Sequence, residues 1–236
     1  MVKGIYQASK SLDVRMKNMS IVANNLSNLN TTGFKRTIPF SEVLSNEGKT
    51  KVKEIVDYRQ GELVPTGGNF DLALDGDDVF FAIQTEDGTR YTRNGRFTLS
   101  EEGFLVDANG DSVLGKSGEI NIKGAMLNDD QTVNISESGE VRVGEILVDS
   151  VMVVKFEDPQ KLKNTSSSQY SMEDDAHEQA KDDEFKLFQG YLEGANVNAI
   201  TEMESMINVN MDYTSAQKMI GFLDRSLEQA NQIGRV

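Results

Sequence analysis

Residues 110–117, GDSVLGKS, match the spacing of a phosphate-binding loop, G-x-x-x-x-G-K-[ST], in which Lys116 would contact the phosphates. That chemistry needs a buried strand before the loop and a helix after it, so that backbone amides face the phosphates. Here Gly118 follows, and Ile120 and Ile122 then alternate with polar residues as in a strand. The sequence therefore predicts a turn between strands here, not a nucleotide site.

A second candidate is DANGDS, residues 107–112, in which Asp107, Asn109 and Asp111 alternate as in a calcium loop. An EF-hand loop places glycine sixth and glutamate twelfth. In this stretch glycine comes fourth and the twelfth residue is Gly118. A β-turn explains the pattern better than a cation site.

The remaining chemistry-bearing residues are isolated. His177 is the only histidine, so a typical zinc site has no second imidazole, and the chain has no cysteine for a thiol nucleophile or a cysteine metal site. The acids Asp77 and Asp78 are expected in a turn at the surface. We therefore predict that the protein is not an enzyme and needs no cofactor or metal.

The charge balance argues against a general affinity for nucleic acid or anionic lipid, because the net charge is -14 and the pI about 4.6. The acids are concentrated in residues 70–190, with 26 acidic against 11 basic residues, whereas residues 1–36 hold six basic and one acidic residue. A solvated surface or attraction between copies explains this asymmetry. The cations Arg90, Arg93 and Arg96 in RYTRNGRF are expected in internal salt bridges or subunit contacts.

The elements that would position these residues begin with an amphipathic helix over residues 1–33, with Gly33 as its stop. Apolar residues recur there with a heptad spacing at two series of positions: Ile5, Leu12, Met19 and Leu26, with Ala8, Val22 and Leu29.

A second amphipathic helix is predicted over residues 197–233, within a terminal segment 191–236. Its apolar residues alternate steps of three and four, with Ile200 and Met203 leading in: Met206, Val209, Tyr213, Ala216, Ile220, Leu223, Leu227 and Ala230. Neither helix can cover its stripe alone, so we expect the two to pair as a coiled-coil-like core, to contact other copies, or both.

Between the helices, residues 34–69 read as a linker or small subdomain, and residues 70–190 as an all-β domain. Short alternating runs separated by turns such as EDGT and ESGE predict roughly eight to ten strands from residue 70 to 158. Residues 159–184 are polar and are expected to form a long surface excursion. The fold class is therefore α+β.

The end of the first predicted helix is rich in neutral amides. With Ile5 at heptad position a, Asn18 and Asn25 are g, Asn24 is f and Asn28 is c. These positions are neighbours and form one arc beside the apolar seam. Uncharged amides suit a face that packs against other helices, because they donate and accept hydrogen bonds without burying charge.

Three blocks resemble the flagellar axial proteins of rod and hook. ANNLSNLNTTGFKR, residues 23–36, resembles their amino-terminal signature, residues 67–115 resemble the β-domain motif of the basal-body rod proteins, and residues 192–207 resemble the carboxy-terminal signature. Ser27 and Ala195 stand where alanine and serine are usual. A second glycine usually precedes the paired aromatics of the β-domain motif, whereas this chain has Asp77-Asp78-Val79.

This resemblance implies a structural subunit that polymerises helically with itself and with other rod proteins into the periplasmic drive shaft. It also implies export through the flagellar type III channel without a cleaved signal peptide. The longest apolar runs, VFFAI at 79–83 and VMVV at 151–154, are too short to span a bilayer, so we expect no membrane insertion, and the net negative charge predicts no contact with nucleic acid. The first 18 residues lack the unbroken apolar run of a cleaved signal. Because residues 34–69 are short, a proximal rod protein is favoured over the distal rod protein.

The expected polymer interface comprises the seam and the amide arc: Ile5, Leu12, Met19, Val22, Leu26, Leu29, Asn18, Asn24, Asn25, Asn28, Met206, Val209, Tyr213, Ile220, Leu223 and Leu227. The expected hinge comprises Thr32, Gly33, Phe34 and Lys35. Other readings remain open: a distal rod or hook-type protein, a nucleotide or rod-region hydrolase, and a secreted monomeric binding module.

Overall fold

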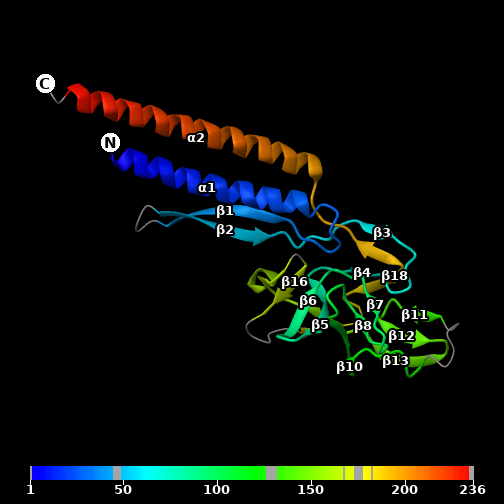
Figure 1. The fold of residues 1–236 in the computed structure, drawn as a ribbon. Coiled ribbons are helices and arrows are strands. Elements are labelled where there is room, and N and C mark those ends of the chain that lie inside the picture. The colour runs from blue at the N-terminus through cyan, green and yellow to red at the C-terminus, as the bar shows by residue number, and fades with distance from the viewer. Residues whose placement is uncertain are drawn as a thin grey trace. The chain divides into compact units, whose positions relative to one another are not determined.

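The computed structural model describes residues 2–44, 49–125, 132–166, 168–172, 178–181 and 183–233 (Figure 1). Helix α1 (Val2–Ser27) opens the chain, helix α2 (Ala199–Ile233) closes it, and the described elements between them are strands and one short 3-10 turn, η1 (Pro159–Lys161). This confirms an α+β protein with two terminal helices. The chain divides into unit 1, residues 1–27, 37–56 and 197–236, and unit 2, residues 28–36 and 57–196.

Unit 1 contains α1, α2 and an antiparallel hairpin of β1 (Thr37–Leu44) and β2 (Lys49–Val56). Helix α1 contacts both α2 and the hairpin, and Figure 1 shows it in blue between them. The Arg15 guanidinium pairs with the Asp212 carboxylate of α2, and Lys17 pairs with Glu54 of β2 at 3.3 Å. The coiled-coil form of the helix pairing remains a prediction.

The first helix ends earlier than its heptads suggest. It stops at Ser27, and residues 28–33 form turns instead of continuing to Gly33. The Thr31 N–H donates to the Asn28 carbonyl at 3.1 Å, and the Thr31 hydroxyl donates to the Asn28 side-chain oxygen at 3.0 Å. The backbone bond from residue 31 to residue 28 is a 3-10-type bond, and such bonds tighten the last turn where an α-helix ends.

Two strand regions escaped the sequence patterns. The β1–β2 hairpin lies in the stretch that reads as an irregular linker, because Pro39 and the exposed Phe40 disguise its alternation. The expectation of a surface excursion at 159–184 is wrong, because β16 (Gln169–Ser171) pairs with β6 and buries Tyr170. A three-residue strand is too short to show a period of two.

Unit 2 is built from antiparallel pairs, and its largest sheet has the order β15-β16-β6-β5-β9-β8-β7, with β10, β14 and β17 attached. Eleven strands lie in the described part of 70–158, one more than expected, since several have only two residues. The strands of unit 2, apart from β16, are β3 (Leu63–Pro65), β4 (Leu72–Asp75), β5 (Val79–Thr85), β6 (Gly88–Thr92), β7 (Thr98–Leu99), β8 (Leu105–Val106), β9 (Ser112–Gly115), β10 (Gly118–Glu119), β11 (Val133–Ile135), β12 (Glu140–Val143), β13 (Ile146–Ser150), β14 (Val153–Lys155), β15 (Lys163–Asn164), β17 (Glu178–Gln179), β18 (Lys186–Gln189) and β19 (Tyr191–Glu193).

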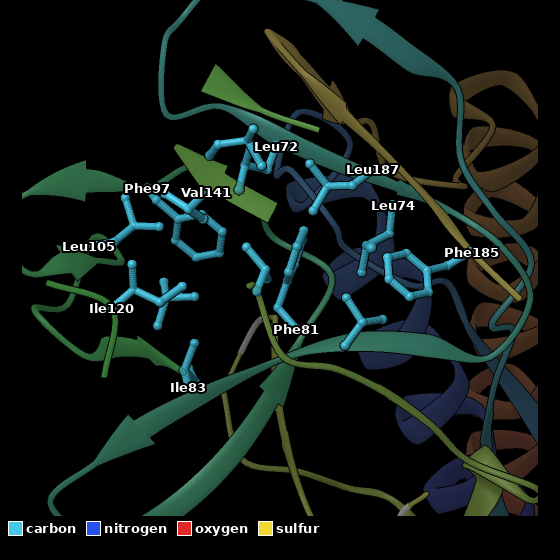
Figure 2. Packing of buried hydrophobic residues seen from close by; sticks show 14 of the residues in the cluster. Leu72, Leu74, Phe81, Ile83, Phe97, Leu105, Ile120, Val141, Phe185 and Leu187 are labelled. Carbon is cyan, nitrogen blue, oxygen red and sulfur yellow. The ribbon is translucent and has the colours of Figure 1, made fainter. Parts of the chain in front are cut away.

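The core of unit 2 explains the apolar run VFFAI in β5. Phe81 and Ile83 point into the main cluster of buried side chains, where Phe81 meets Phe97 edge to face (Figure 2). Phe80, one residue along, instead packs against Tyr170 and Phe156 in a second, aromatic cluster. Both faces of β5 are therefore covered, and such strands lose the alternation of polar and apolar residues.

Candidate assembly site

The stretch that matches a phosphate-binding loop is a β-hairpin. Strand β9 runs to Gly115, the chain reverses at Lys116 and Ser117, and β10 pairs back on β9 from Gly118. A strand therefore follows the turn, whereas a nucleotide site needs a helix there. This agrees with the turn between strands that the sequence predicts.

The calcium-like stretch is also a turn. The Asp107 Oδ1 atom accepts hydrogen bonds from the backbone N–H groups of Asn109 (2.8 Å) and Asp111 (3.0 Å). The Gln169 side chain donates to Asp107 Oδ2 and Asp111 Oδ2 at 2.9 and 3.0 Å. Within the described ranges, no group of three or more His, Cys, Asp or Glu side chains is placed to hold a metal ion. His177 lies outside the described residues.

The arginines of RYTRNGRF confirm the expected internal salt bridges at two positions. Arg90 pairs with Asp87 at 2.7 Å and also donates to the Gln169 side-chain oxygen at 3.1 Å. Arg93 is 1% exposed and pairs with Glu193 at 3.2 Å. Arg96 is exposed.

A buried ionic cluster joins three distant parts of unit 2 around the Glu193 carboxylate. Lys35 Nζ lies 2.6 Å from Glu193 Oε1, and Arg93 Nη1 lies 3.2 Å from Glu193 Oε2. The Gly61 N–H also donates to Glu193 Oε1, at 2.9 Å. The two cations reach further acceptors on the backbone, since Lys35 Nζ donates to the Arg59 carbonyl and Arg93 Nη2 to the Gly76 carbonyl, at 2.9 and 2.6 Å.

Burial governs the electrostatics of this cluster. Desolvation lowers the pKa of the Lys35 ammonium below its ordinary value, while the Glu193 carboxylate opposes that shift. Desolvation likewise lowers the pKa of the Arg93 guanidinium, again against the attraction of Glu193. Two cations thus depend on one carboxylate, and removal of that carboxylate would leave both charges buried without their anion.

The cluster fixes the chain segments that lead to both helices. Residues 33–35 follow α1, residues 193–196 precede α2, and the Gly33 N–H donates to the Glu193 carbonyl at 2.8 Å. The Asn196 side chain adds a second link: its oxygen accepts from the Arg36 N–H at 2.7 Å, and its Nδ2 donates to the Asp57 carbonyl at 2.7 Å. The predicted hinge residues therefore lie at an anchored crossing of two chain segments.

Within unit 1, Asn25 forms the corresponding polar contact between helices and hairpin. Its amide accepts from the Thr37 N–H at 2.9 Å and donates to the Thr37 carbonyl at 2.8 Å. It also donates to Glu202 Oε2 of α2 at 3.2 Å, and both side chains are buried. Helix α2 begins nearby, with Asn198 Oδ1 capping the Thr201 N–H at 3.1 Å.

The other predicted interface residues are distributed as follows. On α1, Val22 is buried, Asn24 is exposed, and the half-buried residues are Leu12, Asn18, Met19 and Leu26. On α2, the predicted residues with described side chains are all half-buried: Met206, Val209, Tyr213, Ile220 and Leu223. Asn28 and Leu29 lie beyond the end of α1, and the side chains of Ile5 and Leu227 lie outside the described set. The role of these residues in a polymer interface remains a prediction.

Helix α2 carries a second apolar face that the heptad pattern did not separate from the first. Ile200 is 78% exposed, and Ile207 and Met211 are 59% and 56% exposed. At about 3.6 residues per turn, these positions lie opposite Val209 and Tyr213. We define the exposed α2 stripe as Ile200, Met203, Glu204, Ile207, Met211 and Phe222. A wheel drawn for the whole helix would have revealed it.

No helix within the described ranges is both long and apolar enough to cross a membrane.

Comparison with known proteins accounts for both ends and the middle of the chain. Residues 7–35 match the model of the flagella basal body rod protein family, residues 73–143 the flagellar hook protein FlgE/F/G D1 domain, and residues 189–233 the flagellar basal body rod FlgEFG protein C-terminal region.

Whole-chain relatives agree with these matches. The flagellar basal-body rod protein FlgF of Caulobacter vibrioides is 33% identical over 225 residues, covering 90% of this chain and 89% of the relative. FlgF of Rhizobium meliloti is 30% identical, covering 97% and 98%. The flagellar basal-body rod protein FlgG of Buchnera aphidicola from Acyrthosiphon pisum is 27% identical, covering 99% and 100%. The chain therefore belongs to the flagellar basal-body rod protein family.

Proposed function

We propose that this chain is a structural subunit of the bacterial flagellar basal-body rod and that it polymerises through its helices into the shaft. Its partners in this proposal are further copies of itself and other rod proteins. It would reach the periplasmic rod through the flagellar export apparatus, without a cleaved signal peptide. The proposal assigns it no catalytic role, cofactor or contact with nucleic acid.

The observation that carries the proposal is the two-faced character of α2. One face, with Val209 and Tyr213, is half-buried in unit 1, where α1 packs against α2. The opposite face is the exposed α2 stripe, with Ile207 59% and Met211 56% exposed. Burying one large apolar side chain contributes about 1.5–3 kcal/mol, so a row of them along one helix favours association.

We further propose that α1 and α2 pair as a coiled-coil-like core, with the amides of Asn18, Asn24 and Asn28 facing neighbouring subunits. Their heptad positions support this role, as does the exposure of Asn24.

Within the rod, we propose a proximal position. Residues 37–56 form a short hairpin, and only residues 57–62 separate β2 from β3. By resemblance, the distal rod protein usually carries additional sequence after its first helix, for which this chain leaves little room.

The test replaces Ile207 or Met211 by aspartate and measures incorporation of the tagged chain into isolated basal bodies, together with motility. We expect both variants to lose incorporation and swimming while unit 2 keeps its cooperative unfolding. Gln217→Asp is the matched control, because it adds the same charge at an exposed position of α2 that lies about 80° around the helix from Ile207. Normal assembly and swimming by Ile207→Asp and Met211→Asp would refute the proposal.

A further inference from the structure

Unit 2 contains a pocket of about 260 Å³ beside the anchored crossing. Its apolar lining comes from Leu29, Val64, Leu192 and Ala195. Leu192 is buried, but Val64 is 46% exposed although it lies in a strand. The exposed Arg96 also lines the pocket. The pocket therefore combines an apolar surface with a cation.

The charge of Arg96 is unmatched in the described part of the chain. Its backbone N–H donates to the Asn94 side-chain oxygen at 3.1 Å, yet no described carboxylate forms an ion pair with its guanidinium. Arg90 and Arg93, in the same strand region, both have acidic partners. An anionic group brought to the pocket would therefore find a cation free to receive it.

The first turns of α2 offer the complementary chemistry. Ile200 is 78%, Met203 56% and Ile207 59% exposed, and the exposed Glu204 lies among them, four residues after Ile200 and three before Ile207. Residues three and four apart share one face of a helix. This end of the exposed α2 stripe is therefore apolar with an embedded carboxylate, which matches a pocket that is apolar with an adjacent guanidinium.

We propose that the pocket receives the first turns of α2 from a second copy of this chain, with Met203 and Ile207 against Val64 and with Glu204 paired to Arg96. This inference rests on the proposed rod function and names the contact by which one subunit engages the next.

The proposed contact joins two different surfaces of identical chains, the pocket on one copy and the α2 stripe on the next. A contact of this head-to-tail kind leaves each copy with one surface still free. Repetition then yields an open helical filament unless the rotation closes a ring. The arrangement therefore suits a rod subunit, whereas a symmetric pair would stop at a dimer.

The absence of cysteine from the chain makes disulfide mapping direct. Val64→Cys and Met203→Cys are introduced on separate, differently tagged copies, which are co-expressed in cells that lack the natural chain. Basal bodies are isolated and oxidised, and dimers carrying both tags are counted. Each copy has one cysteine, so every disulfide joins two chains. We expect dimers from this pair at least about tenfold above the control pair of Val64→Cys with Gln217→Cys, because Gln217 is exposed on α2 but lies well beyond the first turns.

The outcomes are decisive in either direction. Mixed-tag dimers above the control confirm the contact. Assembled rods without such dimers would show that a second copy does not occupy the pocket. The same conclusion would follow if Val64→Cys formed a disulfide with a cysteine introduced into a different rod protein.

A charge exchange provides an independent readout. Arg96→Glu or Glu204→Arg should each lower incorporation about tenfold, and the double variant should restore it. Arg142→Glu, at an exposed site on β12, is the matched control for charge. If Ile207→Asp abolishes assembly while the Arg96 variant assembles normally, the rod function stands and this contact fails. If neither change affects assembly, the rod function itself fails.

Discussion

Lys35 and Glu193 form an ion pair of 2.6 Å whose two side chains are 0% and 1% exposed, although 158 positions separate them in the chain. Lys35 follows the first helix and Glu193 precedes the second. One carboxylate thereby anchors both segments that lead from unit 2 to the helices, and Arg93 adds the β-domain to the same anchor. The crossing of these two segments therefore depends on the buried Glu193 carboxylate.

Glu193→Gln should destabilise unit 2 by about 3–5 kcal/mol, because it leaves Lys35 and Arg93 buried without their anion. Urea unfolding followed by circular dichroism measures the loss. The matched control is Glu140→Gln, which breaks the exposed 3.0 Å pair with Arg142 and should cost less than about 1 kcal/mol. Equal losses in the two variants would show that the buried cluster has no special role.

Gly33→Ala tests the predicted hinge. Gly33 has a φ of +69°, and an added Cβ would collide with the backbone of Arg93 and Asn94. Gly67 has a φ of +72° with no atom within 4 Å of an added Cβ. Gly67→Ala should therefore cost only the backbone penalty of about 1–2 kcal/mol, and Gly33→Ala clearly more. Thermal unfolding of both variants makes the comparison, and a smaller loss at Gly33 would contradict the close approach.

Asn25→Ala should loosen α2 from α1 and from the hairpin, because it removes the hydrogen bonds to Thr37 and Glu202. The free energy of unfolding should fall by about 1–3 kcal/mol, because buried polar groups lose their hydrogen-bond partner. Hydrogen exchange of the backbone amides at the start of α2 measures it. Asn24→Ala, at the exposed neighbouring position, should leave that exchange within twofold of the natural chain. Equally fast exchange in both variants would contradict a specific role of the Asn25 hydrogen bonds.

Asp78→Asn should raise the free energy of unfolding at pH values above the ordinary carboxyl pKa. At pH values well below that pKa the free energy of unfolding should be unchanged. Burial, with the neighbouring Asp77 carboxylate as a second cause, raises the pKa of Asp78 in the folded state. A raised folded pKa means that the folded protein binds more protons than the unfolded chain, so the natural protein loses stability as pH rises through this window. Urea midpoints of both forms from pH 3 to pH 7 test this, with less than about 1 kcal/mol expected at neutral pH. If the urea midpoints of the two forms differed most at acidic pH, the direction of the predicted pH dependence would be wrong.

Asp78 also resolves the departure of this chain from the β-domain motif. Its φ is +57°, in the left-handed region that glycine favours and that aspartate tolerates better than most residues. The turn before Phe80 and Phe81 is therefore formed without the second glycine. The sequence pattern identified the altered turn, but the backbone conformation there could only be seen in three dimensions.

What could be predicted followed from long, regular patterns. About four heptads at each end identified both helices, and alternating runs identified most of the β-domain. The hairpin at 37–56 and strand β16 were missed because proline or shortness hides their period. The Glu193 cluster could not be predicted, since buried lysine and arginine are rare and their partner lies far along the chain. Of the exposed α2 stripe, the heptad pattern used only Ile200 and Met203, as the start of the seam, and it left Ile207, Met211 and Phe222 unassigned.

We infer that the exposed α2 stripe is buried between subunits of the rod. Electron cryomicroscopy of isolated basal bodies containing this chain tests it most directly. We predict density for the chain in the rod, with Ile207 and Met211 packed against another subunit. Rods in which this chain is absent, or in which both side chains face open solvent, would contradict the account.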